Sequence, residues 1–154
     1  MKLREQGKKQ KIISVLLVIL WAFLIFFFSN QTGIVSEGKS NFLVDCLNFI
    51  VNLVVDIDLT EYEIIFFLVR KLAHMFLYFM LSLLVYYMLY QFKVKKRLVL
   101  TLVICFFYAI SDEVHQLFIR DRSGQIIDVL IDTIGASLPI LYMFFKKSRA
   151  RLAK

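Results

Sequence analysis

The sequence predicts an all-α membrane protein with four transmembrane helices and one extracytoplasmic, interfacial amphipathic helix. The 154 residues are 60% hydrophobic, with a mean hydropathy of +0.72 and a single proline. That composition is far more apolar than the composition of a soluble domain. The apolar residues also gather in runs of bilayer-spanning length, which is about 20 residues. We therefore expect one membrane domain and little room for a separate soluble domain.

Four apolar runs are long enough to cross the hydrocarbon core. The first run follows a basic stretch, but no cleavage site with small residues comes after it, so we interpret it as a retained anchor rather than a signal peptide. We expect the spans at residues 12–28, 72–90, 98–118 and 126–145. They lie in a membrane domain of residues 12–145, between basic tails at residues 1–11 and 146–154.

The basic residues predict the orientation of the chain. Fourteen of the 19 lie in the two tails and in the loop between the second and third spans. Cytoplasmic segments carry an excess of Lys and Arg, so we expect both termini to be cytoplasmic. The net charge of +7 therefore reflects topology and gives no support for nucleic-acid binding. We expect a multi-pass membrane protein in contact with membrane lipid.

The longest exterior loop, residues 30–71, contains a segment with helical amphipathicity at residues 41–56. Its polar residues recur at steps of three and four: Asn41, Asp45, Asn48, Asn52 and Asp56. Asp45 makes this a poor spanning segment and a good interfacial helix, with a re-entrant segment as the alternative. Gly33 and Gly38 bracket an expected turn before it. After it, Thr60 and Glu63 have the spacing of a capping box, which would start the next helix near Glu61.

Polar side chains converge at the exterior ends of all four predicted spans. Insertion of a carboxylate at mid-membrane costs roughly 2.5–3.5 kcal/mol. Such groups therefore occur in membrane helices where they are paired, hydrated or functional. Taken singly, His74 has a structural interpretation as an interhelical hydrogen-bonding residue, and Arg70 as a snorkelling anchor. As a converging set they indicate a site. The expected binding residues are Ser29, Gln31, Arg70, Lys71, His74, Tyr78, Asp112, Glu113, His115, Gln116, Arg122, Asp128 and Asp132.

These residues fall into four spaced motifs. They are Ser29-Asn30-Gln31, Arg70-Lys71-x-x-His74-x-x-x-Tyr78, Asp112-Glu113-x-His115-Gln116-x-Phe118-x-x-x-Arg122, and Asp128 with Asp132-Thr133-x-Gly135. Together they resemble the VanZ-like family over the four-span body. The family usually has Asn where this chain has Asp132. It takes its name from a protein that gives low-level resistance to the glycopeptide teicoplanin. The resemblance implies a location in the bacterial cytoplasmic membrane and an association with the cell envelope and with antibiotic resistance, not a particular reaction.

Three function classes fit these residues. In the first, a polar pocket in the outer leaflet binds or shields an anionic headgroup, such as that of a lipid-linked cell-wall precursor. Arg70, Lys71 and Arg122 suit phosphate or carboxylate. In the second, a membrane-embedded enzyme acts on a lipid headgroup, with these candidate catalytic residues: Asp112, Glu113, His115 and His74. A lipid or proton transporter ranks last, because the inner halves of the spans hold almost no polar residues.

The sequence contains no recognised spacing of metal ligands, so it predicts no metal site and requires no cofactor. Two histidines and several carboxylates are nevertheless the ligand types that a metal-assisted form of the enzyme would use. Arg122 is expected in a short exterior loop. The loss of a surface charge there should cost little stability, typically within about 0.5 kcal/mol.

Overall fold

A computed structural model of the chain describes residues 2–52, 60, 62–122 and 124–152. Over this part of the chain the secondary structure is entirely helical, apart from turns and bends, and it contains no strand. The helices are α1 (Lys2–Ser29), α2 (Gly33–Asn52), α3 (Glu63–Gln91), α4 (Arg97–Gln116) and α5 (Ile126–Leu152). The predicted all-α class is confirmed.

Four of these helices are long and apolar enough to cross a membrane, as the sequence predicts. The segments are Glu5–Ser29, Glu63–Gln91, Arg97–Gln116 and Ile126–Lys146. α1 extends back through the N-terminal basic tail, and α5 continues to Leu152 in the C-terminal one. α4 ends at Gln116, two residues before the predicted end of the third span, and Leu117 is its C-cap.

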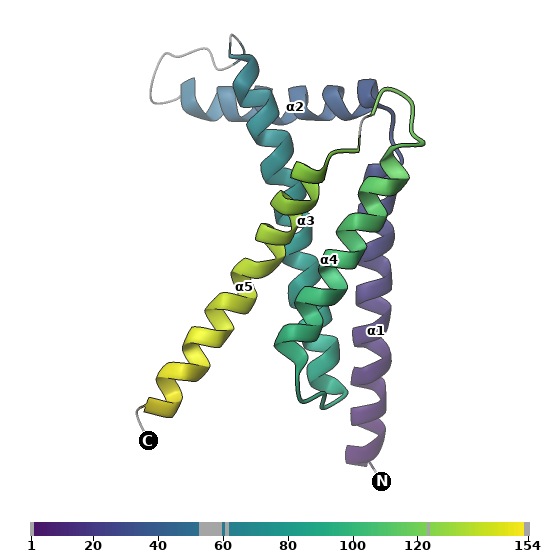
Figure 1. The fold of residues 1–154 in the computed structure, drawn as a ribbon, viewed down its shortest axis with the longest axis vertical. Coiled ribbons are helices and arrows are strands. Elements are labelled where there is room, and N and C mark those ends of the chain that lie inside the picture. The colour runs from purple at the N-terminus through teal and green to yellow at the C-terminus, as the bar shows by residue number, and fades with distance from the viewer. Residues whose placement is uncertain (1, 53–59, 61, 123, 153–154) are drawn as a thin grey trace.

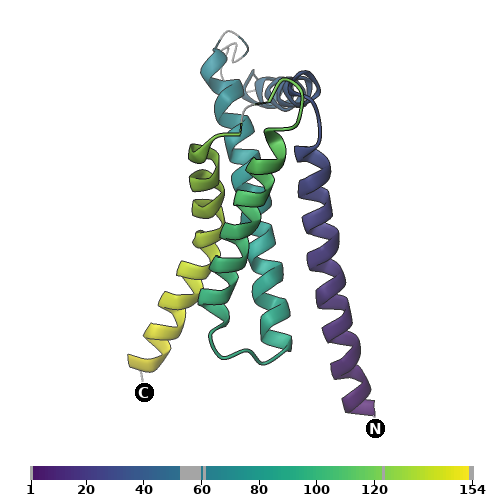
Figure 2. The same ribbon diagram turned by 45° about the vertical axis from the view of Figure 1, so that its right-hand side comes forward.

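α3 lies at the centre of the arrangement and contacts each of the other four helices (Figure 1). α2 lies across one end of the bundle, beside the connection between α4 and α5, and we call this the α2 end. Both termini and the connection between α3 and α4 lie at the opposite end, the terminal end. Figures 1 and 2 both show α1 and α5 diverging toward the terminal end. The basic segments that the sequence places on one side of the membrane thus share one end of the molecule.

Long-range hydrogen bonds tie α1 to α3 and α4. The indole Nε1 of Trp21 donates to the Leu77 carbonyl at 2.9 Å, and the Tyr108 hydroxyl donates to the Ala22 carbonyl at 2.6 Å. Ile25 is buried beside these contacts in a cluster of apolar side chains from α1, α3, α4 and α5. Lipid tails are as apolar as leucine, so helix association in a membrane depends on close packing and on such interhelical hydrogen bonds.

α5 approaches the backbone of α3 very closely at Gly135. A Cβ atom on Gly135 would overlap the carbonyl oxygen of Met75, and its Cγ as well. Small residues allow such close contacts between membrane helices. His74 precedes Met75 in α3, and Asp132 lies three residues before Gly135 in α5. The contact therefore brings these two ionisable side chains toward each other.

α2 contains the described part of the predicted amphipathic helix, but it begins earlier, at Gly33. The turn that we expected between Gly33 and Gly38 is wrong, because both residues lie in the helix and the chain turns at residues 30–32 instead. Residues 53–56, the end of the predicted segment, lie outside the described residues.

The faces of α2 differ as an interfacial helix requires. Val44 is buried, and α2 contacts α3. Phe42 and Phe49, seven residues apart, are 67% and 70% exposed, whereas Asn41 and Asp45 lie on a polar stripe. A helix with exposed aromatic side chains on one face and polar residues on another is typical of a helix that lies in the membrane interface.

The start of α3 differs from the predicted capping box. The helix begins at Glu63, and its N-cap is Tyr62, which makes no side-chain capping hydrogen bond. Thr60 lies two residues earlier and is therefore not the N-cap. The helix still begins well before residue 72, so Arg70 and Lys71 are held on a continuous helical scaffold.

Candidate binding site at the α2 end

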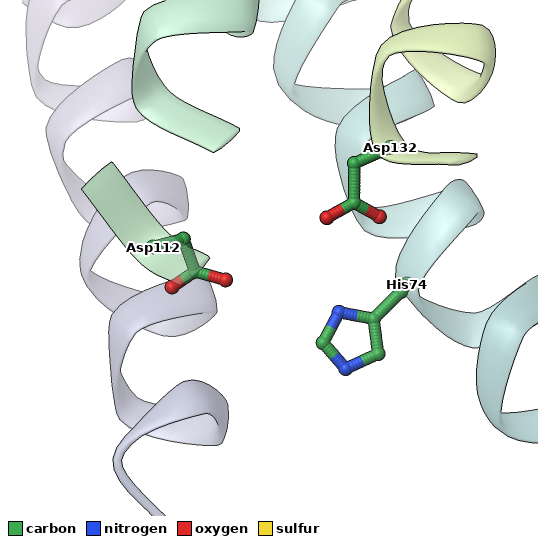
Figure 3. Close-up of side chains that lie close together, drawn as sticks. All are labelled: His74, Asp112 and Asp132. Carbon is green, nitrogen blue, oxygen red and sulfur yellow. The ribbon is translucent and has the colours of Figure 1, made fainter. Parts of the chain in front are cut away.

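Three ionisable side chains from three helices converge at the α2 end: His74 of α3, Asp112 of α4 and Asp132 of α5. One imidazole nitrogen and one carboxylate oxygen of each aspartate all lie within 4.8 Å of one another. Figure 3 shows the imidazole and both carboxylates directed into a common space. We call this group the His–Asp cluster.

Asp132 is the most isolated member of the His–Asp cluster. It is 1% exposed, and neither of its carboxylate oxygens has a hydrogen-bond partner in the part of the chain that the structure describes. Nearly all buried polar groups in proteins are hydrogen-bonded, and burial of an unpaired charge costs several kcal/mol. The Asp132 carboxylate therefore needs a proton or a cation to neutralise it.

Gln116 joins the carboxylates to the loop after α4. Its amide nitrogen donates to Asp112 Oδ2 at 3.2 Å and to Glu113 Oε1 at 3.1 Å. Its amide oxygen accepts a hydrogen bond from Arg122 Nη1 at 3.0 Å. Asp112 and Gln116 are four residues apart, so the first of these contacts follows from helical spacing alone. All of the polar atoms of this side chain are thus used within the protein.

Glu113 fixes the chain between α4 and α5. Its Oε2 accepts a hydrogen bond from the backbone N–H of Gln125 at 3.0 Å. Gly124 lies against the Glu113 carbonyl, where a Cβ atom would come within 2.5 Å of the oxygen. Glu113 is 6% exposed and has polar partners on both oxygens. These contacts give Glu113 a structural role in holding the loop.

Arg122 is not the freely exposed loop residue that the sequence predicts. Besides its bond to Gln116, its Nη2 donates to the Phe28 carbonyl of α1 at 3.3 Å, and its Nε is buried without a hydrogen-bond partner. Asp121, with φ of +59°, adopts the left-handed conformation just before it. Burial lowers the pKa of the Arg122 guanidinium, which still remains a cation at neutral pH. Its replacement should therefore cost more stability than the loss of a surface charge.

A cavity of about 230 Å³, which we call the cationic cavity, lies between the end of α1, α2 and α3. Its polar lining consists of Gln31, Lys39, Ser40, Arg70, His74 and Arg122. Its apolar lining consists of Phe28, Leu43, Ala73, Phe76 and Leu77. The Lys39 ammonium lies 4.6 Å from the centre of the Phe28 ring, a distance typical of a cation–π contact. His74 lines this cavity and also belongs to the His–Asp cluster, so the two sites adjoin.

Lys71 and Asp128 form an ion pair between α3 and α5. The Lys71 ammonium also lies 5.2 Å from the centre of the Phe67 ring. The pair borders a second, much smaller cavity of about 10 Å³, which His74, Gln116 and Asp132 also line. Lys71 is therefore engaged by a carboxylate, whereas Arg70 lines both cavities.

The remaining predicted binding residues lie at the margins of the site. His115 turns toward α1, where its Nε2 lies 3.2 Å from Asn30 Oδ1 and its ring centre lies 4.6 Å from that of Phe26. Ser29 lies near Asp112, but its buried hydroxyl does not reach hydrogen-bonding geometry. The buried Tyr78 hydroxyl also lacks a partner.

The structure thus separates the predicted binding residues into groups with different surroundings. His74, Asp112 and Asp132 form the His–Asp cluster, and Gln31, Arg70 and Arg122 line the cationic cavity beside it. Glu113, Gln116, Lys71 and Asp128 have protein partners, and His115 faces α1. Sequence reasoning missed Lys39 and Phe28. The only available signal for Lys39 was that it is one of the few basic residues outside the tails and the 93–97 segment. The binding roles of all these residues stay predictions.

Comparison with known proteins identifies the family of the chain. Residues 14–147 match the model of the VanZ/LLP1 family. A comparison with curated proteins found no match, and neither did a comparison with solved structures. The matched segment contains every residue of the His–Asp cluster and of the cationic cavity, and it confirms the resemblance that the sequence motifs indicate. The chain belongs to the VanZ/LLP1 family.

Proposed function

We propose that this membrane protein binds a phosphate-bearing lipid headgroup at the α2 end and thereby contributes to resistance against teicoplanin-type glycopeptides. The observation that carries the proposal is the cationic cavity, where Arg70, Arg122 and Lys39 adjoin an apolar wall. Arginine offers paired N–H donors that match the oxygens of phosphate, and a charge-assisted hydrogen bond is about twice as strong as a neutral one.

The size of the cationic cavity favours a headgroup over the antibiotic itself. Pockets for drug-sized ligands usually measure about 300–1,000 Å³, and glycopeptides are larger than such ligands. A cavity of about 230 Å³ suits a phosphate group and the atoms next to it. Phe76 and Leu77 supply an apolar surface for the first methylene groups of a lipid tail.

The position of the cationic cavity suits the outer leaflet. The positive-inside rule makes the basic terminal end cytoplasmic, so the α2 end faces the exterior. α2, with Phe42 and Phe49 exposed, then lies in the outer interface beside the cavity. A lipid-linked cell-wall precursor, or another anionic lipid of that leaflet, would present its phosphate at this level. Shielding of such a headgroup would limit the access of a glycopeptide to its target.

The first test measures susceptibility to teicoplanin together with membrane protein levels, in a strain where the parent chain gives measurable protection. Arg122→Lys should abolish protection, because one ammonium cannot hold Gln116, the Phe28 carbonyl and a phosphate at once. Arg120→Lys, at an exposed position of the same loop, is the matched control and should protect like the parent. If Arg122→Lys lowers protein levels, Arg70→Gln takes its place. Full protection by a normally accumulating variant of either arginine would refute the proposal.

The second test measures binding directly, through the thermal unfolding of the purified chain in detergent. Bound ligand raises the melting temperature, so phosphatidylglycerol should raise it more than zwitterionic phosphatidylcholine. Arg70→Gln should lose that difference, whereas Lys95→Gln, which removes a cation at the terminal end, should retain it. A rise with inorganic phosphate alone would show that the phosphate is recognised without the lipid tail. An unchanged response in Arg70→Gln would contradict the proposal.

A membrane-embedded enzyme that acts on the same headgroup is the second candidate function. The juxtaposition of His74, Asp112 and Asp132 favours it, because these groups include possible general acids and bases. Glu113 and His115 are weaker candidates, since the structure gives both of them protein partners. Turnover of a phospholipid by the purified chain that is lost in Asp112→Asn would support the enzyme. If the purified chain binds a phospholipid without turning it over, the result would favour the shielding role over the enzyme.

A further inference from the structure

We propose that His74, Asp112 and Asp132 bind a divalent metal ion, for which Zn²⁺ is the best match in ligand chemistry. Zn²⁺ accepts imidazole nitrogen and carboxylate oxygen, and sites with three protein ligands keep a fourth position open. Each of the three residues offers one such atom, and the three atoms lie within 4.8 Å of one another. The inference of a metal site does not rest on the proposed function of the cationic cavity, which adjoins it.

The Asp132 carboxylate points to a ligand independently of the ligand count. It is 1% exposed, both of its oxygens lack a hydrogen-bond partner among the described residues, and it is directed toward His74 and Asp112 (Figure 3). Lys71 does not neutralise it, because that ammonium is paired with Asp128. A cation bound by Asp132 would satisfy a group that the protein leaves without any hydrogen bond.

The geometry fits an ion after small side-chain rotations. Zn²⁺ bonds to nitrogen and oxygen are about 2.0–2.2 Å long, so tetrahedral ligand atoms lie roughly 3.4 Å apart. The observed separations, up to 4.8 Å, exceed this spacing by no more than about 1.4 Å, and the three side chains already face one another (Figure 3). The cavity of about 10 Å³ beside His74 and Asp132 is close to the smallest space that holds one water molecule, which would serve as the fourth ligand.

Gln116 supplies the supporting contact that metal-binding carboxylates usually have. Its amide nitrogen donates to Asp112 Oδ2, and this leaves Oδ1 available to the ion. Outer contacts of this kind orient metal ligands, and their loss typically lowers metal affinity about 10–100-fold. Gln116→Leu should therefore weaken metal binding although it removes no ligand.

The charges at the α2 end are compatible with a divalent ion. Four carboxylates, Asp112, Glu113, Asp128 and Asp132, lie near three fixed cations, Arg70, Lys71 and Arg122. With all of them ionised and His74 neutral, this group carries a net charge of −1. A divalent ion changes the net charge to +1, which would also favour an anion in the adjoining cationic cavity.

The test measures metal content in the full-length chain, purified in detergent without a histidine tag. After treatment with a chelator, the chain is loaded with Zn²⁺, freed of excess metal and analysed by plasma mass spectrometry. The parent should retain about one Zn²⁺ per chain. His74→Gln and Asp132→Asn should retain much less, because loss of either ligand should lower the affinity for Zn²⁺ at least about 100-fold. His115→Gln and Asp45→Asn are matched controls at the same end, and both should bind like the parent.

A second measurement keeps the proposal testable even if those variants fold poorly. Co²⁺ reports its ligands through its absorption spectrum, and a thiolate ligand adds an intense charge-transfer band. His74→Cys should therefore produce that band with Co²⁺, whereas the parent and His115→Cys should not. The absence of the band, or a parent chain that retains no more Zn²⁺ than Asp132→Asn, would overturn the proposal and show that protons alone neutralise the His–Asp cluster.

Discussion

The hydrogen bonding of buried polar atoms differs between the two ends of the bundle. Toward the terminal end, the hydroxyls of Ser14, Ser82 and Thr101 each donate to a carbonyl of their own helix, at 2.7–2.9 Å. Such bonds form within one helix and need no neighbouring helix. Toward the α2 end, Asp132 and Tyr78 present buried oxygens that have no hydrogen-bond partner among the residues that the structure describes. These three hydroxyls at the terminal end are satisfied within their own helices, whereas the Asp132 carboxylate at the α2 end requires a proton, an ion or a ligand.

Cationic side chains show a parallel difference. At the terminal end, Arg97 donates to the Tyr86 hydroxyl at 3.1 Å and lies over the Tyr90 ring. A cavity of about 510 Å³ there is lined by four cations, Lys95 and Lys146 among them, by Tyr86 and by apolar side chains, and no carboxylate of the described residues lines it. This arrangement suits nonspecific contact with anionic lipid. At the α2 end, the cations of the cationic cavity lie beside the carboxylates of the His–Asp cluster and the ion pair of Lys71 with Asp128. Charges of both signs in fixed positions favour one ligand over others.

The comparison between the two ends depends most on the orientation of the chain in the membrane. The expected labelling result for this orientation is all or none. In a Cys46→Ser background, a membrane-impermeant maleimide should label Thr32→Cys in intact cells and should spare Lys95→Cys. The reason is that the positive-inside rule places the α2 end outside. The remaining cysteine, Cys105, is buried and should stay unlabelled. The reverse pattern would place the cationic cavity on the cytoplasmic side and would end the outer-leaflet proposal.

Among the substitutions considered, removal of the Gln116 side-chain amide should give the largest loss of stability. Gln116→Leu leaves Asp112, Glu113 and Arg122 without one hydrogen bond each. We expect the free energy of unfolding to fall by about 3 kcal/mol, because a buried group left unsatisfied costs roughly 1–3 kcal/mol. Unfolding in mixed micelles with increasing SDS, followed by circular dichroism, measures the change. A loss under about 0.5 kcal/mol, the range of ordinary surface substitutions, would show that the network is solvated rather than buried.

Substitution of two helical glycines by alanine distinguishes the effect of close helix packing from the effect of helix propensity. Gly135→Ala forces α5 away from the Met75 carbonyl, so it should cost about 1–3 kcal/mol and should also weaken Zn²⁺ binding by moving Asp132. Gly38→Ala in α2 is the control, because a Cβ atom there meets nothing within 4 Å. It should be neutral or stabilising by up to about 1 kcal/mol. The same unfolding experiment applies to both, and equal effects would show that the contact between α3 and α5 does not require a glycine at position 135.

The smallest effect is expected at the terminal end. Thr101→Val removes a hydroxyl that donates only to the Arg97 carbonyl of its own helix. The free energy of unfolding should change by no more than about 1 kcal/mol, and protection against teicoplanin should be unchanged. A loss of protection at normal protein levels would show that the terminal end also takes part in function.

The sequence by itself determined the class and the local geometry of this protein. Run length and composition predicted four spans because a bilayer needs about 20 apolar residues per crossing. The spacing of Asn41, Asp45 and Asn48 predicted the amphipathic helix that α2 contains, and residues four apart in a helix, such as Asp112 and Gln116, share a face. Such features depend on residues close together in the chain. The helix boundaries were predicted less accurately than the helices themselves, as the early start of α2 and the Tyr62 N-cap of α3 show.

Only the tertiary structure decided which polar groups meet. His115 and Gln116 were both expected among the binding residues, in one motif with Asp112, yet Gln116 bonds to Asp112 and His115 turns to Asn30. Arg122 returns from its loop to α1, and His74 meets Asp132 beside the close contact at Gly135. These outcomes depend on the rotation and separation of neighbouring helices, which the packing of distant residues sets and which spacing along one helix does not encode.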